Sequence, residues 1–402
     1  MSGPFRMAEG GLIDRSRTVT VTFDGVPYAA HPGDTLASAL LAHGVRTVAR
    51  GPYTGRPRGV YGVGAEEPNA FVQVESGAGE PMVRATQIEV YDGLRATCLA
   101  GKGRLIDRPD TSRYDKTHAH CDVLVVGGGR SGVAAAREAA AAGARVILAE
   151  SRPTLAAGLP DLPELTVLTR TTVTGYYDHG YVVAVERRTD HLGDRAPAHL
   201  SRQRLWHIRA GRIVLATGAL ERPILFEDND RPGVMLAGAA AAYPARYGVL
   251  PGRRAVVFGC HDGALQAALD LHDSGVALAA VLDARPGPSP LHARLHVRGI
   301  EVLSGHAVFG TSGNADGVLD GARIAPLDHP DAITLISCDL LAVSGGWNPN
   351  LHLFSQAGGR TRWSPHSAAF VPDPAAPAPR CHLTLTGSAS GDLGARAASR
   401  SV

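Results

Sequence analysis

The stretch Asp122–Glu150 reads DVLVVGGGRSGVAAAREAAAAGARVILAE, and it decides the fold. It opens with a short β-branched run, continues into an alanine-rich segment and closes with a second apolar run. This pattern predicts a buried strand, a helix and a second strand. Between the first strand and the helix, Gly127, Gly129 and Gly132 give the spacing G-x-G-x-x-G. The stretch therefore predicts a βαβ unit with a glycine turn.

Each part of this unit suits a bound dinucleotide. Gly127 allows the tight turn, Gly129 lets a pyrophosphate approach the backbone, and Gly132 lets the helix pack closely on the strand. Glu150 ends the second strand, where a carboxylate accepts hydrogen bonds from an adenosine ribose. Because a carboxylate repels a ribose 2′-phosphate, Glu150 favours NAD or FAD over NADP. The motif does not separate NAD from FAD, and a glycine turn that binds nothing is the competing interpretation.

Composition excludes several classes of protein. The 402 residues suffice for two or three domains, and 44% of them are hydrophobic. The 40 basic and 38 acidic residues are mixed along the chain, so no nucleic-acid-binding face is indicated. The cysteines form no C-x-x-C pair, so neither a metal site nor a disulfide framework is expected; they are Cys98, Cys121, Cys260, Cys338 and Cys381.

The first residues, 1–17, read MSGPFRMAEGGLIDRSR and are expected to be a disordered arm. They have no apolar core, so they do not resemble a secretion signal. No apolar run in the chain approaches the ~20 residues of a membrane span. These features predict a cytoplasmic protein that binds no membrane.

The next segment predicts a small module. Thr18–Phe23 and Val26–Ala30 read as strands joined by an Asp-Gly turn. A helix is expected over Leu36–His43, capped by Asp34 or Thr35. Two strands, a turn and a helix are typical of a β-grasp or ferredoxin-like module.

This module, expected over residues 18–106, lacks the ligands of an iron–sulfur cluster. Residues 56–74, where a plant-type ferredoxin has clustered cysteines, contain none, and the nearest is Cys98. No iron–sulfur cluster is therefore expected. Four charged residues there could bind an anion or another protein chain, or could form local ion pairs: Arg56, Arg58, Glu66 and Glu67. A polar linker is expected over residues 107–120.

The first dinucleotide-binding part is expected over residues 121–250. Near its end, the strand Ile213–Ala216 leads into Thr217 and Gly218. Small residues directly after a strand let the backbone pass close to a nucleotide, although an ordinary strand-to-loop turn has the same pattern. Together the two glycine-bearing segments predict one site with six members: Gly127, Gly129, Gly132, Glu150, Thr217 and Gly218.

A second βαβ repeat is expected over residues 251–345. It repeats the order strand, glycine turn, helix, strand and acid, but its glycine signature is incomplete. Gly259 is present, while His261 and Ala264 stand where the second and third glycines would be. A histidine would crowd a pyrophosphate, so this repeat is interpreted as structural first. Residues 346–402 are expected to return to the first part and to close the chain.

Seven stretches together resemble one family, the alpha subunit of heterotetrameric sarcosine oxidase, from about residue 18 onward. They are PGDTLASALLAHGV, RPRGVYGVGAEEPNAFVQV, CDVLVVGGGRSG, TGYYDHG, LWHIRAGRIVLATGALERP, NDRPGVMLAG and DLLAVSGGWNPNLHLFSQAGG. Related alpha subunits serve opine, hydroxyproline and proline dehydrogenases. The resemblance implies an α/β chain: a two-repeat FAD/NAD(P)-binding Rossmann-like fold with an N-terminal β-grasp ferredoxin-like module that lacks cluster cysteines.

The resemblance also implies cofactors and partners. In sarcosine oxidase the alpha subunit holds NAD, a beta subunit oxidises the amine on FAD, and FMN lies at their interface. Carried over, the six site residues would hold NAD, with FAD as the alternative. The expected partners are a small amine such as sarcosine and a beta-like flavoprotein subunit. No acid/base group is identifiable in the chain, so no catalytic residue is named.

Three departures from the family leave other functions open. We expect these 402 residues to encode no folate-binding aminomethyltransferase-like domain, the segment after Glu150 is short and lacks a Gly-Gly pair, and the closing helix after Gly391 is abbreviated. The preferred hypothesis is an alpha-like subunit of a heteromeric, flavin-dependent amine or imino-acid oxidoreductase. The alternatives are a self-contained FAD- or NAD(P)H-dependent oxidoreductase and a non-catalytic, shortened scaffold subunit.

Overall fold

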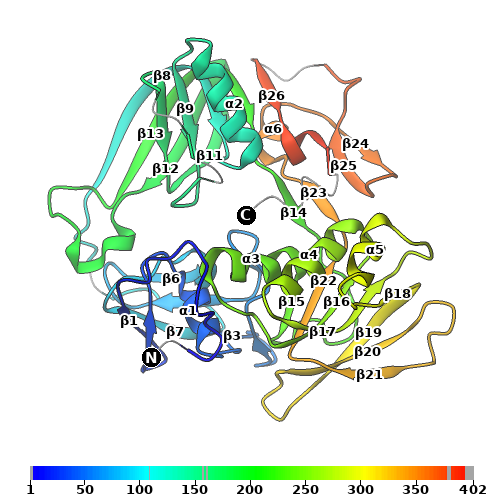
Figure 1. Cartoon of the computed structure of the whole chain (residues 1–402). Helices are drawn as coiled ribbons and strands as arrows, with labels where there is room; N and C mark the ends of the chain where they lie inside the picture. The colour runs from blue at the N-terminus through cyan, green and yellow to red at the C-terminus, as the bar shows by residue number, and fades with distance from the viewer. Residues whose placement is uncertain (1–2, 108, 156–157, 160–161, 378–381, 394–402) are drawn as a thin grey trace. The chain divides into compact units, whose positions relative to one another are not determined.

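The structure is a computed structural model that describes residues 3–107, 109–155, 158–159, 162–377 and 382–393. These residues form two compact units, each described separately below (Figure 1). Unit 1 comprises Met1–Thr111, His191–Asp194 and Glu221–Gly346. Unit 2 comprises Ser112–Asp190, Arg195–Leu220 and Trp347–Val402. The chain thus leaves the glycine-turn unit at residue 220, earlier than the expected boundary at 250, and returns to it at 347.

The N-terminal part of unit 1 is a mixed sheet with one helix. The strand order is β2-β1-β7-β3-β4, and β5 pairs with both β6 and β7. The strands are β1 (Val19–Phe23), β2 (Val26–Ala30), β3 (Ala49–Arg50), β4 (Pro57–Arg58), β5 (Phe71–Val74), β6 (Glu80–Arg84) and β7 (Leu94–Ala100). Helix α1 (Leu36–Ala42) begins with a capping box, because Thr35 Oγ1 accepts from Ser38 N and Ser38 Oγ accepts from Thr35 N. The predicted hairpin, cap and helix are confirmed.

Residues 3–17 differ from the expected disordered arm, because buried polar contacts hold them on unit 1. The guanidinium of Arg6 donates to both carboxylate oxygens of Asp34, at 3.1 and 2.7 Å, and to the carbonyl oxygen of Tyr247. The two charged side chains are only 2% and 0% exposed. An ion pair this well covered must be fully hydrogen-bonded to be tolerated, and Asp34 also accepts from Ser38 Oγ.

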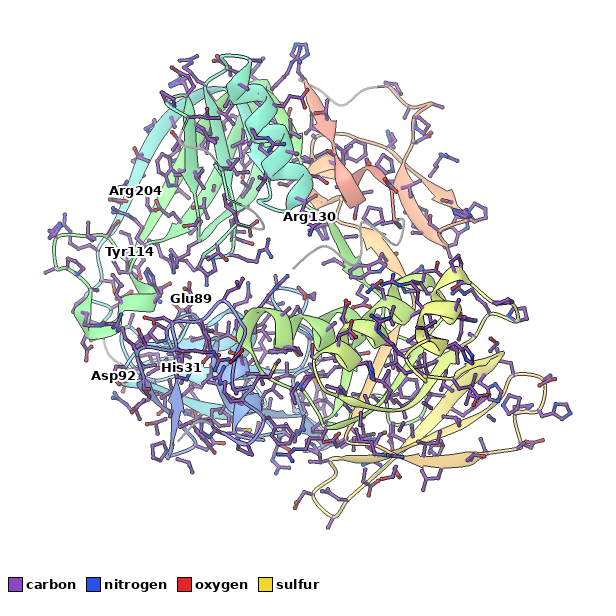
Figure 2. The ribbon with its side chains drawn as sticks, in the orientation of Figure 1. His31, Glu89, Asp92, Tyr114, Arg130 and Arg204 are labelled. Atoms are coloured by element: carbon purple, nitrogen blue, oxygen red, sulfur yellow. The ribbon has the colours of Figure 1, made fainter. Side chains whose placement is uncertain are left out.

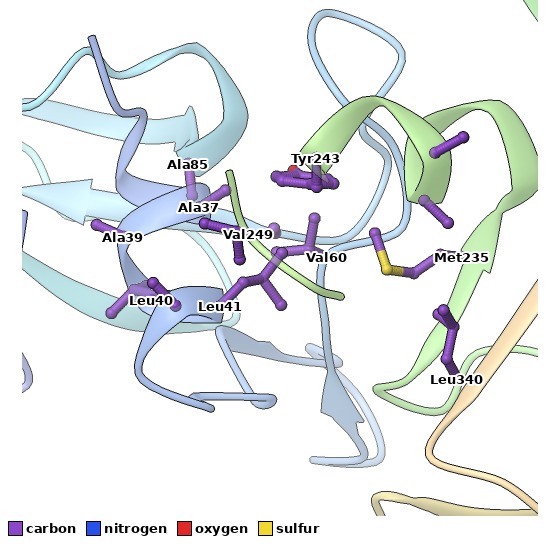
Figure 3. Close-up of a cluster of buried hydrophobic side chains, with 14 of the residues drawn as sticks. Ala37, Ala39, Leu40, Leu41, Val60, Ala85, Met235, Tyr243, Val249 and Leu340 are labelled. Atoms are coloured by element: carbon purple, nitrogen blue, oxygen red, sulfur yellow. The ribbon is translucent and has the colours of Figure 1, made fainter. Parts of the chain in front are cut away.

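The N-terminal module does not have a core of its own. Leu41 of α1 and Tyr243 of α3 (Ala237–Tyr247) belong to one continuous group of buried side chains, together with Met235 and Leu340 (Figure 3). Tyr243 is fully buried, and its hydroxyl donates to the carbonyl oxygen of Gly62. Residues 18–106 therefore share their hydrophobic core with the second repeat, although the sequence pattern presents the two as separate parts.

The second part of unit 1 is a parallel five-stranded sheet in the order β15-β22-β16-β17-β18. Its strands are β15 (Val234–Leu236), β22 (Leu340–Ser344), β16 (Arg254–Gly259), β17 (Ala277–Asp283) and β18 (Val302–Ser304). Helices α3, α4 (Asp262–Asp273) and α5 (Pro290–His296) accompany it (Figure 1). The predicted β16–α4–β17 repeat is confirmed. An antiparallel sheet follows, formed by β19 (His306–Gly313), β20 (Leu319–Pro326) and β21 (Thr334–Ser337).

Unit 2 is built on a sheet in the order β10-β9-β8-β13-β12-β11, with β26 added to β13. Its strands are β8 (Tyr114–Val126), β9 (Val146–Ala149), β10 (Leu165–Leu168), β11 (Thr171–Tyr177), β12 (Tyr181–Arg187), β13 (Gln203–Leu215) and β26 (Leu383–Leu385). Strands β10, β9, β8, β13 and β26 run parallel, so their carboxyl ends meet at one edge. Helix α2 (Arg130–Ala141) packs on one face (Figure 1), and α6 (His352–Gln356) contributes to the apolar cluster on the other.

The second half of the expected linker over residues 107–120 is strand. Residues 114–120 form the first half of β8 and pair in parallel register with β13, His118 lying opposite His207. The two imidazole rings stack with their centroids 4.8 Å apart. Most side chains of this half are exposed, so it lacks the buried apolar positions by which strands are recognised in a sequence.

Short elements complete the described chain: β14 (Ala219–Glu221), β23 (Trp347–Pro349), β24 (Thr361–Ser364), β25 (Ala369–Pro372), and the 3₁₀ turns η1 (Ala85–Gln87), η2 (Asp178–Gly180), η3 (Asp190–Arg195) and η4 (Gly387–Ser390). None of the helices in the described ranges is long and apolar enough to span a membrane. The closing helix expected after Gly391 lies mostly outside the described residues.

Candidate functional site

Two glycines of the G-x-G-x-x-G turn are required by the packing of unit 2. Gly127 has a φ of +107°, and a Cβ atom on it would lie 2.3 Å from the carbonyl oxygen of Ala216. A Cβ atom on Gly132 would lie 1.8 Å from the carbonyl oxygen of Gly127. The first glycine thus permits the turn, and the last lets α2 approach the strand.

Gly129 has a different role, because no contact among the described residues requires it to be glycine. Its φ is −69°, and a Cβ atom there would meet no atom of the described chain within 4 Å. Gly129 is the N-cap of α2 and offers no side chain to the first N–H groups of that helix. The space beside it is therefore open and faces a helix terminus that favours anions.

Glu150 is fixed against the glycine turn. It is 5% exposed, and its Oε2 accepts from the backbone N–H of Gly128 at 2.5 Å. Its Oε1 accepts from Ser151 Oγ at 3.2 Å, and from the backbone N–H and Nε of Arg152 at 2.8 and 3.1 Å. The carboxylate lies where the sequence predicted it, at the carboxyl end of β9, but it already has four donors within its own chain.

Thr217 and Gly218 lie at the same edge of the sheet, immediately after β13. The Cβ position of Gly127 is 3.5 Å from the backbone nitrogen of Thr217, so the two turns adjoin. Thr217 Oγ1 donates to the carbonyl oxygen of Asn350 at 2.7 Å, and Asn350 N donates back to the carbonyl oxygen of Gly218 at 2.9 Å. All six predicted residues therefore lie in unit 2, at the carboxyl ends of its parallel strands.

Two further residues belong to this edge and were not among the six predicted site residues. Arg130, the first residue of α2, is exposed at the end of the helix nearest the turn (Figure 2). A cation at a helix N-terminus is unfavourable by itself, which fits a position beside an anion. Gly387 approaches the first turn of α2, since a Cβ atom on it would lie 2.4 Å from Ser131 Oγ. An arginine after the second glycine was the signal available for Arg130.

In the second repeat, which belongs to unit 1, a side chain caps the N-terminus of the helix. His261 is the N-cap of α4, and its Nδ1 accepts from the backbone N–H of Gly263 at 3.0 Å. Its other ring nitrogen, Nε2, lies 2.8 Å from Ser344 Oγ and must carry the ring proton, since Nδ1 is an acceptor. Burial, reinforced by Arg285 and Arg222, lowers the pKa of His261 to about 4, so the ring is neutral. The imidazole therefore caps the helix N-terminus, which is the kind of position where a phosphate binds in nucleotide-binding repeats.

Two acids of unit 1, one in the second repeat and one before it, are also engaged. Asp283, the counterpart of Glu150, is 1% exposed and accepts from the N, Nε and Nη2 atoms of Arg285 and from His292 Nε2. Glu221 accepts from Gly238 N at 2.9 Å, at the N-terminus of α3, and from Ser344. Burial raises the pKa of Glu221 to about 8 in spite of these donors. These contacts support the structural interpretation of the repeat.

The four charged residues of the N-terminal module form contacts within unit 1. Arg56 donates to Asp228 Oδ1 at 2.6 Å and to Asp230 Oδ1 at 2.8 Å, and Arg58 pairs with Asp230. Glu67 is fully buried and accepts from four backbone N–H groups, those of Tyr61, Gly62, Asn69 and Ala70. Glu66 accepts from Val63 N. The two arginines therefore form ion pairs, but with residues that lie 172 and 174 positions from Arg56 instead of with neighbours in the loop. Glu67 organises its own loop through backbone N–H groups.

The donor set of the N-terminal module does not fit an iron–sulfur cluster. A cluster needs four ligands, usually thiolates, and residues 16–99 contain only Cys98. Burial raises the pKa of this thiol, which disfavours the thiolate that a metal would need. Over the ranges that the structure describes, no three His, Cys, Asp or Glu side chains are arranged to hold a metal ion.

A parallel βαβ unit with an open, glycine-capped helix terminus, followed by a second βαβ repeat, defines the class of two-repeat nucleotide-binding oxidoreductases. Residues 121–364 match the family described as pyridine nucleotide-disulphide oxidoreductase, and the chain belongs to that family. This fold binds FAD or NAD(P). Residues 16–99 match the family described as 2Fe-2S iron-sulfur cluster binding domain, although the cluster ligands are missing from them.

Curated relatives confirm the resemblance to sarcosine oxidase alpha subunits. The chain is 41% identical to the sarcosine oxidase alpha subunit of Corynebacterium sp. (strain U-96), over 92% of this chain and 42% of that protein. It is 36% identical to the sarcosine oxidase alpha subunit of Rhizobium meliloti (strain 1021), over 97% of this chain and 45% of that protein. An opine oxidase subunit of Rhizobium meliloti is 27% identical over 69% of this chain and 60% of its own length. The chain spans less than half the length of the sarcosine oxidase alpha subunits.

Solved structures confirm the fold. L-proline dehydrogenase from P. horikoshii superposes with a TM-score of 0.66 and 22% identity, covering 96% of this chain and 71% of that one. Thioredoxin reductase from T. acidophilum superposes with a TM-score of 0.50 and 13% identity, covering 70% of this chain and 94% of that one. The predicted α/β architecture of two Rossmann-like repeats with a ferredoxin-like module is thereby confirmed.

Proposed function

We propose that this chain is an alpha-like subunit of a heteromeric, flavin-dependent oxidoreductase of secondary amines, and that it binds one dinucleotide at the glycine turn of unit 2. The observation that carries the proposal is the open space beside Gly129 at the N-terminus of α2. Both flanking glycines are required by packing, whereas Gly129 leaves room that no atom of the described chain uses. A phosphate group is the ligand that such a terminus prefers.

The residues divide into three roles toward a bound dinucleotide. The first N–H groups of α2 and the exposed guanidinium of Arg130 would hold the pyrophosphate. Gly129 would let it approach the backbone. Glu150 would lie beside the adenosine ribose, and Thr217 and Gly218 would line the edge next to the turn. NAD is the preferred occupant, because a carboxylate beside the ribose suits an unphosphorylated 2′ position, and FAD is the alternative.

The amine chemistry is proposed to take place on a partner protein. Flavin would supply the hydride acceptor for the N–CH group, and this chain would support that reaction by dinucleotide binding and assembly. The partner is proposed to be a flavoprotein similar to the beta subunit of sarcosine oxidase, with FMN at the shared interface. Sarcosine and similar secondary amino acids are the proposed substrate class. No residue of this chain is assigned a catalytic role.

The first experiment tests the cofactor. The chain is purified alone and denatured, and the released nucleotides are identified by absorbance and mass spectrometry. NAD without flavin is the expected result. Release of FAD would favour a self-contained flavoenzyme. No nucleotide, and none bound after NAD or FAD is added, would contradict the proposal and favour a non-catalytic scaffold.

The second experiment tests the partner. The chain is coproduced with a sarcosine oxidase beta-type flavoprotein from the same genome, and the mixture is separated by size. Coelution at a defined ratio, with sarcosine-dependent reduction of flavin only in the complex, is expected. A beta-type protein that oxidises sarcosine equally well without this chain, and does not coelute with it, would contradict the proposed role in a heteromeric enzyme.

One observation weighs against the self-contained alternative. That function needs two competent nucleotide sites, and the imidazole of His261 already caps the N-terminus of α4 in the second repeat. This contact supports one dinucleotide per chain.

A further inference from the structure

Part of the unit 2 sheet carries side chains on one face that the apolar clusters do not include. The first half of β8 pairs with β13, β13 with β12, and β12 with β11. Because side chains alternate between the two faces of a sheet, Val183 and Leu205 lie on one face and Val182 and Ile208 on the other. Val182 and Ile208 are core residues, whereas Val183 and Leu205 belong to none of the apolar clusters of the described residues. We call the first surface the histidine–tyrosine face; its polar and aromatic members are Lys116, His118, Tyr177, Tyr181, His207 and Arg209.

Four aromatic rings form a continuous row across the histidine–tyrosine face. The ring centroids of His118 and His207 are 4.8 Å apart, those of His207 and Tyr181 5.9 Å, and those of Tyr181 and Tyr177 5.8 Å. The guanidinium of Arg209 lies over the ring of Tyr181, 5.0 Å from its centroid. Tyr177 at one end of the row is 51% exposed, and His118 at the other end is also exposed. Tyrosine and arginine are among the residues that contribute most to the binding energy of protein interfaces.

The strands give this face positive charge only. Lys116 and Arg209 are exposed, and the four strand segments 114–120, 171–177, 181–187 and 203–210 contain two acids, Asp115 and Glu186. Both acids project from the opposite face, where they accept from side chains of β13. The histidine–tyrosine face therefore complements an acidic protein surface. A two-fold contact with a second copy is disfavoured, because it would place the same cations against each other.

We propose that the histidine–tyrosine face is the docking surface for an acidic patch of the flavoprotein partner. The inference deepens the proposed function and rests on it, because it names the surface through which that partner binds. The aromatic row forms the centre of the contact, and Lys116 and Arg209 attract the acidic side chains of the partner. His118 lies eight residues before Val126 at the end of β8, about 26 Å along the strand. Docking at this face therefore leaves the glycine turn accessible to its dinucleotide.

The test measures the dissociation constant between the full chain and the sarcosine oxidase beta-type flavoprotein from the same genome, by calorimetry. In the double variant Lys116→Glu/Arg209→Glu this constant is expected to rise at least about 100-fold, because both cations are replaced by charges that repel an acidic patch. The matched control is Arg137→Glu/Arg362→Glu, which reverses two exposed arginines of α2 and β24 and changes the net charge by the same amount. That control should stay within about threefold. Tyr177→Ser, which changes no charge, should raise the constant at least about tenfold.

The outcomes separate this inference from the proposed function, provided that circular dichroism shows each variant to be folded. If the two proteins bind each other and Lys116→Glu/Arg209→Glu binds as tightly as the unsubstituted chain, the partner docks elsewhere, while the heteromeric function stands. Equal weakening in both double variants would reveal an effect of net charge and overturn the inference. Self-association of the purified chain that Lys116→Glu/Arg209→Glu abolishes would assign the face to a second copy and overturn it as well. If the unsubstituted chain does not bind the flavoprotein, both proposals are overturned.

Discussion

The α carbon of Gly132 lies so close to the carbonyl oxygen of Gly127 that a Cβ atom on Gly132 would stand 1.8 Å from it. The contact joins the first turn of α2 to the end of β8, and backbone atoms form both sides of it. Neither side can move without changing the turn that presents the helix N-terminus. The contact makes the fold of unit 2 and the geometry of its candidate site inseparable at this point.

Gly132→Ala is therefore expected to destabilise unit 2. A methyl group cannot be accommodated against a backbone oxygen, and overpacking of this kind costs about 1–3 kcal/mol or more. Urea unfolding followed by circular dichroism measures the change. Gly129→Ala, which adds the same methyl group in open space, is the control and should leave the free energy of unfolding within about 0.5 kcal/mol. Equal stability of the two variants would contradict the packing argument.

Gly129→Val separates binding from folding. The side chain would enter the space proposed for the pyrophosphate, so the dissociation constant for the dinucleotide is expected to rise by at least about 100-fold, or about 2.7 kcal/mol. Thermal unfolding should change little, because no atom of the described chain lies within 4 Å of the added Cβ. Gly287→Val, at a glycine of unit 1 with the same open surroundings, is the control. Undiminished binding in Gly129→Val would place the site elsewhere.

The buried carboxylate of Glu67 predicts a large local effect on stability. Glu67→Ala leaves four backbone N–H groups without their acceptor, and each buried donor left unsatisfied costs about 1–3 kcal/mol. We expect a loss of about 3 kcal/mol or more in the free energy of unfolding, measured with urea. Glu66→Ala removes a carboxylate that accepts from Val63 N, and it should cost about 1 kcal/mol. A smaller loss for Glu67→Ala would show that water or the loop replaces the carboxylate.

Glu221 and His261 predict how stability depends on pH. Burial raises the pKa of Glu221 from 4.5 to about 8, so the folded chain binds more protons than the unfolded chain between these values. Its contribution to stability is lost as the pH rises through this window, by up to about 1.4 kcal/mol per unit. The pKa of His261 is lowered from 6.5 to about 4, so its contribution is lost as the pH falls through that window. The two effects oppose each other between about pH 4.5 and 6.5.

From pH 6.5 to 8, the effect of Glu221 on stability is no longer opposed by that of His261. Glu221→Gln is therefore expected to gain stability relative to the unsubstituted chain as the pH rises from 6.5 to 8. Urea unfolding at pH 5, 6.5 and 8 measures the difference, and Glu66→Gln serves as the control carboxylate. A difference between Glu221→Gln and the unsubstituted chain that is independent of pH would contradict the raised pKa.

The local elements could be predicted from the sequence because their signals are local. The β-branched run, the glycine spacing and the helix cap at Thr35 each depend on a few neighbouring residues, and the structure has them where expected. The first half of β8 was missed because residues 114–120 bury almost nothing, so no apolar alternation marks them. The ion pair between Arg6 and Asp34 joins residues far apart in sequence, and no periodicity reports such a contact.

For the candidate site, the sequence predicted the positions of the residues but not all of their contacts. The six predicted residues do lie at one edge of the unit 2 sheet, because parallel strands place their carboxyl ends together. The state of Glu150 was not foreseeable, since its availability depends on the rotamer of Arg152 and on a backbone N–H of the turn.

The single core shared by α1, α3 and the parallel sheet of unit 1 affects how the chain can fold during synthesis. Its contributors come from Met1–Thr111 and Glu221–Gly346, on either side of the segments that build most of unit 2. While ribosomes are still translating the middle of the message, the emerging N-terminal module lacks the side chains of α3 that complete its interior. Until α3 has been synthesised, the module therefore exposes apolar surface that the complete protein buries. A chaperone that binds the nascent chain would have its greatest effect on yield during this interval.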